Sequence, residues 1–120
     1  MTSEAEPLSP GTVVLVPFPF TDQSGAKRRP AVVISSIAYN AVWPDLILMP
    51  VTSQLRASAV FGEVWLQDWS QSGLLKPSAV KPVIATFEQR LILRVMGTLS
   101  ERDCDALHTS LELILANPHA

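Results

Sequence analysis

The sequence predicts a mainly β domain with one C-terminal helix (α+β), in which antiparallel strands form a compact barrel. Its 120 residues are the length of a single domain. Short β-branched and apolar runs, separated by Pro, Gly or polar residues, fill most of the chain, and only the last segment has helical periodicity. We expect residues 1–10 to be a flexible tail, residues 11–116 to be one domain and residues 117–120 to be a second tail.

The expected strands follow one another along the chain. Each is a run of Val, Ile, Leu or Thr that is too short for a helix and is bounded by turn residues. These strands are residues 12–18, 31–35, 46–51, 60–66, 78–84 and 91–98. We expect a polar, glycine-containing loop at residues 21–28, a helical turn at residues 39–41 and a chain reversal at residues 87–90.

The last element reads as a helix. Ser100 is a good N-cap, and acidic residues follow it in the first turn. Pro118 marks the end of the helical pattern. Its apolar face consists of Cys104, Leu107, Leu111, Ile114 and Leu115.

Composition excludes several classes of protein. Ten prolines and 17% charged residues argue against a coiled coil and against a disordered chain. One cysteine, Cys104, excludes a disulfide framework and an all-cysteine zinc site. Cys104 and His108 share a helix face, but we expect a core residue and a helix flank, not a metal site. No apolar run reaches the roughly 20 residues of a transmembrane helix, and the acidic start does not resemble a signal peptide, so we expect a cytoplasmic protein with no membrane partner.

The charge is unevenly distributed. The whole chain has a net charge of −2. Residues 24–94 contain eight basic and four acidic side chains, which gives that span a charge of +4. A basic face able to meet phosphate and ordinary surface scatter both fit this pattern.

Several short strings, in order, carry a family resemblance. They are GTVVLV at 11–16 leading into PFPF at 17–20, RRPAVVIS at 28–35, PVTS at 50–53, SAVKP at 78–82 and GTLS at 97–100, before the final helix. Over about residues 11–115 the chain resembles the MazF/PemK family of toxin endoribonucleases of type II toxin–antitoxin systems. The resemblance implies an SH3-like barrel of the CcdB and MazF type with a C-terminal helix.

The resemblance also assigns catalytic residues. It implies that Arg29 and Thr52 are the catalytic pair and that Ser53 is a supporting donor. A guanidinium can fork onto two phosphate oxygens and stays charged, while a strand-end hydroxyl can donate to the same phosphate. Lys81 stands where some relatives carry a basic residue that assists the leaving group, and Val83 stands where some carry an acid.

Other residues are candidates for binding RNA. In this family the loop at residues 21–28 borders the RNA channel, where Lys27 and Arg28 could grip phosphates. Arg56 would line the same groove, and Phe20 is a candidate platform for base stacking.

The implied function is sequence-specific, metal-independent cleavage of single-stranded RNA. Attack by the ribose 2′-OH would leave a 2′,3′-cyclic phosphate and a 5′-OH, with no cofactor. The resemblance further implies a homodimer, inhibition by a cognate antitoxin, and DNA binding by the toxin–antitoxin complex. Two alternatives stay open. One is a CcdB-like poison of DNA gyrase, which the absence of a C-terminal Trp disfavours, and the other is a degenerate member that only binds an antitoxin.

Overall fold

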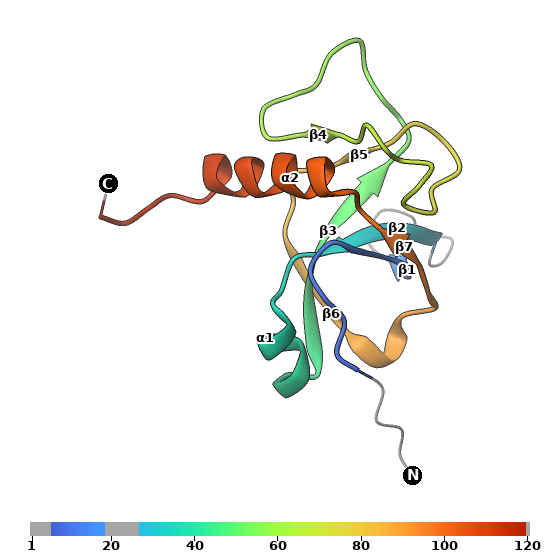
Figure 1. Ribbon diagram of the computed structural model, residues 1–120, viewed down its shortest axis with the longest axis vertical. Helices are drawn as coiled ribbons and strands as arrows, with labels where there is room; N and C mark the ends of the chain where they lie inside the picture. Colours follow the sequence, from blue (N-terminus) through green and yellow to red (C-terminus); the bar gives the residue numbers. More distant parts are fainter. Residues whose placement is uncertain (1–5, 19–26, 120) are drawn as a thin grey trace.

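The computed structural model describes residues 6–18 and 27–119, apart from the side chains of Phe18 and Lys27. A mainly antiparallel sheet and a C-terminal helix make up this part of the chain (Figure 1), which confirms the α+β class. The elements are β1 (Thr12–Phe18), β2 (Lys27–Val33), α1 (Ile37–Val42), β3 (Asp45–Thr52), β4 (Val64–Trp65), β5 (Ala79–Val80), β6 (Ala85–Glu88), the 3₁₀ turn η1 (Gln89–Leu91), β7 (Arg94–Thr98) and α2 (Glu101–Ile114).

The expected barrel is an open sheet. The strands lie in the order β4–β5–β3–β2–β1–β7, and β6 pairs with β3 beside this path. Among the described strands no pairing joins β7 to β4, so the sheet keeps two edges. Because β4 and β5 contain two residues each, that end of the sheet is too short to curl round and meet β7.

Strand β3 is shared between three ladders. Its first half pairs with β6, from Asp45 opposite Glu88 to Leu48 opposite Ala85. Its middle pairs with β2, as far as Pro50 opposite Ala31. Its end pairs with β5, where Val51 and Thr52 lie opposite Val80 and Ala79. Leu48 is paired both with Val33 of β2 and with Ala85 of β6, so β2 lies on one side of β3 while β6 and then β5 lie on the other. Pairing with β2 stops at Pro50, and a gap opens between β2 and the end of β3.

Strand β2 begins earlier than expected. It starts at Lys27 and not at Ala31, because β1 continues to Phe18 and pairs with it along its whole length. Arg29 consequently lies within the strand, opposite Val16. After Val33 the chain turns away from the sheet, and the Ser35 hydroxyl donates to the Asn40 side chain.

Other strand boundaries were also wrong. Of the expected strand at residues 60–66 only Val64–Trp65 pairs, and of residues 78–84 only Ala79–Val80 pairs. The expected reversal at residues 87–90 is half strand, because β6 extends to Glu88. Pro82 lacks the N–H that a longer β5 would need, and Gly62 has a φ of +81°, which is outside the strand region.

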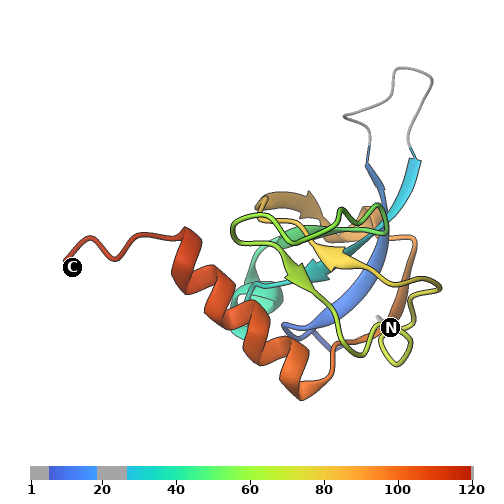
Figure 2. The same ribbon diagram turned by 90° about the horizontal axis from the view of Figure 1, so that it is seen from above.

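The alternating side chains of the sheet form two cores. On one face, Val13, Val32, Met49, Val51 and Val80 pack with Leu107 of α2. The other face buries Val14, Val16, Ala31, Val33, Leu46 and Leu48. Helix α2 lies alongside the first face (Figure 2), and its N-cap is Ser100, as the sequence predicts: Oγ accepts from the Asp103 N–H at 3.3 Å.

Candidate functional site

A hollow opens where β2 and β3 separate. We call it the Arg29 hollow; its volume is about 250 Å³. Strand β2 supplies Arg28, Arg29 and Pro30, and the end of β3 supplies Val51 and Ser53. The remaining lining residues are Leu74, Leu75, Lys76, Ser78 and Met96.

The Arg29 hollow is lined by positive charge. Arg28, Arg29 and Lys76 line it, whereas none of its lining residues is acidic. In the described part of the chain, no carboxylate forms an ion pair with these three cations. Arg29 is half-buried and fixed within the paired part of β2, whereas Arg28 is exposed. Uncompensated cations on a rigid strand attract anions, and phosphate suits the planar fork of arginine.

The far wall of the Arg29 hollow is held against β7 by close backbone packing. Gly73 has a φ of +87°, and a Cβ built on it would lie 2.2 Å from the carbonyl oxygen of Met96. Across this contact, a Cβ on Gly97 would lie 2.5 Å from the carbonyl oxygen of Ser72. Both positions therefore need glycine, and the contact fixes residues 74–76 beside Arg29. Within that wall the side chain of Leu75 is 89% exposed.

A second hollow, of about 500 Å³, adjoins the same strand end. We call it the Thr52 hollow. Its lining residues are Thr52, Gln54, Leu55, Arg56, Val60, Glu63, Lys81, Pro82 and Val83. Val51 and Ser53 line the first hollow whereas Thr52 and Gln54 line the second, as expected from the alternation of side chains along a strand. The Thr52 Oγ1 accepts from the Gln54 N–H at 3.0 Å, so the hydroxyl proton stays available to a ligand.

The structure distributes the predicted site residues between these hollows. Arg29 lies with Arg28 and Ser53 in the Arg29 hollow. The other three, Thr52, Arg56 and Lys81, line the Thr52 hollow. Pairing between β2 and β3 ends at Ala31 and Pro50; the same register, if continued, would set Arg29 opposite Thr52 across the gap between the strands. Phe20 and the side chain of Lys27 lie outside the described residues.

Sequence reasoning missed two residues of these hollows. Lys76 completes the cationic lining of the first, and Glu63 brings a carboxylate into the second. Neither lies in a motif or at a spacing that links it to Arg29 or Thr52. Lys76 has one signal, because it contributes to the positive charge of residues 24–94, and Glu63 has none.

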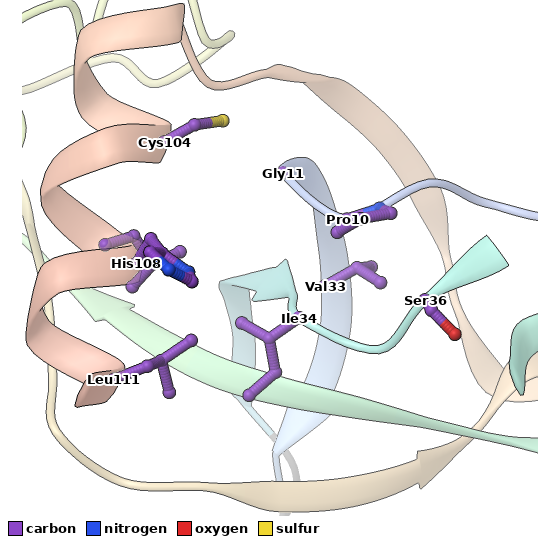
Figure 3. A pocket seen from close by; sticks show the side chains of 9 residues that line it. Pro10, Gly11, Val33, Ile34, Ser36, Cys104, His108 and Leu111 are labelled. Carbon is purple, nitrogen blue, oxygen red and sulfur yellow. The ribbon is translucent and has the colours of Figure 1, made fainter. Parts of the chain in front are cut away.

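A third hollow separates α2 from the ends of β1 and β2. Its volume is about 370 Å³, and Cys104, His108 and Leu111 face Gly11 and Ile34 across it (Figure 3). Burial raises the pKa of the Cys104 thiol, and the neighbouring carboxylates raise it further, so the thiol stays protonated. At the rim of this hollow, the exposed His108 side chain has its Nε2 3.5 Å from the Glu112 carboxylate. Within the described residues no three potential metal ligands gather.

The fold and hollows together define a small α+β protein with a positively charged hollow at the end of its central strand. The stretch from residue 9 to residue 115 matches the family described as PemK-like, MazF-like toxin of type II toxin–antitoxin system. The chain belongs to this family, as the short strings in its sequence predict.

Solved structures share the fold. An endoribonuclease in complex with its cognate antitoxin, from a mycobacterial species, is 18% identical, with a TM-score of 0.73 over 92% of this chain and 99% of that one. The MazE–MazF complex of Deinococcus radiodurans is 26% identical, with a TM-score of 0.67 over 87% and 92% of the two chains. The Mycobacterium tuberculosis toxin MazF-mt6 is 19% identical, with a TM-score of 0.65 over 83% and 91%.

No curated protein matched the sequence. Among the described residues, no helix has the length and apolar character needed to span a membrane.

Proposed function

We propose that this toxin is an endoribonuclease that cleaves single-stranded RNA at a specific sequence, without a metal ion. The observation that carries the proposal is the Arg29 hollow. There a strand-held guanidinium, a second arginine and a lysine converge, and the lining has no carboxylate. Membership of the PemK-like, MazF-like toxins supports the same activity.

The chemistry follows from the charges that cleavage creates. The ribose 2′-oxygen attacks the adjacent phosphorus, the bond from phosphorus to the 5′-oxygen breaks, and the products are a 2′,3′-cyclic phosphate and a 5′-OH. Negative charge grows on the non-bridging oxygens of the phosphorane between these steps. Arg29 can bind two of those oxygens through its fork, and the Thr52 hydroxyl can donate to the same group from the other side of the strand end. Arg28 and Lys76 suit the flanking phosphates.

The partners of the proposed enzyme are single-stranded RNA, a cognate antitoxin and a second copy of the chain, all in the cytoplasm. Two of the structures with this fold are described as complexes with an antitoxin. Large apolar side chains lie exposed near the C-terminal end of α2, and they suit a two-fold interface: Phe61, Leu113 and Leu115.

Cleavage of a long transcript tests the proposal. We expect primer extension to show a small set of cut sites within one short sequence, unchanged by EDTA. New 5′ ends should accept phosphate from a polynucleotide kinase, because they carry a free hydroxyl. An oligonucleotide with a single 2′-deoxyribose at the cut site should resist cleavage. Loss of activity in EDTA, or cleavage of the deoxy substrate, would overturn the mechanism; an inactive protein that inhibits gyrase would favour the CcdB-like alternative.

A further inference from the structure

The Thr52 hollow contains a carboxylate that suits proton transfer. Resting on the proposed function, we propose that Glu63 is the general base that removes the proton of the 2′-OH. Arginine is a poor base because its pKa lies above about 12. Glu63 lines one hollow with Thr52 and Lys81. Of the described carboxylates, it alone lines either of the two hollows at the end of β3.

One oxygen of Glu63 is held by the protein. Its Oε1 accepts from the indole Nε1 of Trp65 at 2.9 Å and from the Val60 N–H at 3.3 Å. Within the described residues no donor is bonded to Oε2. The carboxylate is thus oriented through one oxygen, and the other remains able to accept a hydroxyl proton.

The backbone before Glu63 is also held. The buried Ser110 hydroxyl of α2 donates to the carbonyl of Gly62. A Cβ at position 62 would lie 2.8 Å from the Ile114 side chain, so the backbone at Gly62 packs directly against α2. Glu63 then leads directly into β4. The helix thus holds the backbone next to Glu63, and the bonds from Val60 and Trp65 hold its carboxylate, as a catalytic group requires.

The other carboxylates of the positively charged span line neither hollow at the end of β3, and two of the three form ion pairs. Asp68 forms a two-point ion pair with Arg102, and Glu88 pairs with Arg90 at 2.8 Å. Asp45 is paired in β3 opposite Glu88, at the end of the strand distant from Thr52. Of these carboxylates, only Glu63 shares a hollow with Thr52 and with the cations Arg56 and Lys81.

The proposed step balances protons and bonds. The 2′-O–H bond breaks, its proton passes to Glu63, and its electron pair forms the bond from the 2′-oxygen to phosphorus. The bond from phosphorus to the 5′-oxygen then breaks, and that oxygen takes a proton from the Lys81 ammonium. Exchange with water returns the proton of Glu63 to solvent and restores the proton of Lys81.

The test compares Glu63→Gln with Trp65→Phe. Glutamine keeps an oxygen that can accept from Trp65 and Val60 but is no base, whereas Trp65→Phe keeps the carboxylate and removes one of its donors. We expect Glu63→Gln to slow single-turnover cleavage of an RNA oligonucleotide by about 10²–10⁴-fold. It should also lose the acid limb of the pH–rate profile, where a carboxylate base becomes protonated. Trp65→Phe should lose less activity than Glu63→Gln and should keep that limb, because the carboxylate base is still present. The remote Glu88→Gln should leave both the rate and the limb unchanged.

Three results would overturn the inference. They are near-wild-type cleavage by Glu63→Gln, an unchanged acid limb in that variant, and equal losses in Glu63→Gln and Trp65→Phe, which would show that Glu63 only supports the loop. Thermal unfolding of each variant separates loss of fold from loss of chemistry. If wild-type protein cleaves no RNA, the proposed function fails and the inference falls with it; if wild-type protein cleaves and Glu63→Gln does too, only the inference fails.

Discussion

Arg29 combines a half-buried position with a charge that no described carboxylate neutralises. Its backbone is paired with Val16 of β1, so the guanidinium is presented by a rigid element. We expect Arg29→Ala to remove cleavage and Arg29→Lys to fail nearly as badly, since lysine supplies the charge without the fork. Loss of a donor to a developing oxyanion costs about 3–4 kcal/mol, or 10²–10³ in rate. Single-turnover cleavage rates measure this loss.

Arg90→Lys is the matched control for Arg29→Lys. Arg90 lies in η1, is 76% exposed and pairs with Glu88, away from both hollows at the end of β3. Its replacement should leave the rate unchanged. An Arg29→Lys variant with most of its activity would show that Arg29 positions the substrate by charge alone.

Replacement of Thr52 tests whether the hydroxyl in the Thr52 hollow takes part in cleavage. Thr52→Val preserves shape and strand propensity, so we expect a loss of cleavage comparable to that of Arg29→Ala. The lost bond to the Gln54 N–H should lower stability by only about 1 kcal/mol. Cleavage rates and thermal unfolding of the same preparation separate the two effects. Thr86→Val, at an exposed position of β6, is the control; equal activity losses in the two variants would deny Thr52 a special role.

At the scale of elements, the start of α2 is tied to the segment that follows β4. The Asp68 carboxylate accepts from Arg102 at 2.7 and 2.8 Å and from the Ser100 hydroxyl at 2.6 Å. These bonds lower the pKa of Asp68 from 3.8 to about 2, and those from Arg102 have the largest effect. Asp103, buried in the first turn, accepts from the N–H groups of Gln67 and Asp68.

The lowered pKa of Asp68 predicts an acid-sensitive contact. A carboxyl with a lower pKa in the folded state contributes stability above its unfolded pKa and loses it as the pH falls towards the folded value. We expect the contribution to be complete above about pH 4 and to disappear towards pH 2. The midpoint of thermal unfolding should fall more steeply across this window in the wild type than in Asp68→Asn. Parallel curves would contradict the prediction.

The elements that local pattern alone determines were predicted well. Strand β1 has the bounds expected, and α2 begins at the predicted cap. Elements that depend on distant partners were not. β6 exists because β3 offers it a free edge from Asp45 to Leu48, and the early start of β2 depends on the length of β1. The same reason explains why the sequence predicts Arg29 as a candidate site residue and does not predict Glu63. Arg29 belongs to a local motif, whereas the chain before Glu63 is placed by a contact with α2.

At the scale of the whole molecule, the net charge is −2, yet five cationic side chains line the two neighbouring hollows at the end of β3. We expect the antitoxin to bind through an acidic segment that is disordered until it binds, with Asp and Glu side chains in place of phosphates. Part of its attraction should be screened by salt. Titration of an antitoxin C-terminal peptide at low and high salt should show weaker binding at high salt. A double replacement of Arg28 and Arg56 by alanine should reduce both affinity and salt dependence.

If the affinity for the antitoxin peptide changed neither with salt nor with the double replacement, the antitoxin would bind elsewhere on the surface. Arg90→Ala, which removes one cation outside the two hollows, controls for the general loss of positive charge. Salt dependence that falls equally in both variants would indicate long-range attraction without a docking site.

The alternation of side chains at the end of β3 makes the two hollows separately adjustable. A substitution of Ser53 would alter the lining of the Arg29 hollow, and a substitution of its neighbour Gln54 would alter that of the Thr52 hollow. A library that varies Ser53 and Leu75 would reshape the Arg29 hollow while leaving every lining residue of the Thr52 hollow in place. Deletion of one residue between Pro50 and Thr52 would instead exchange the two sets, because each following side chain would move to the opposite face.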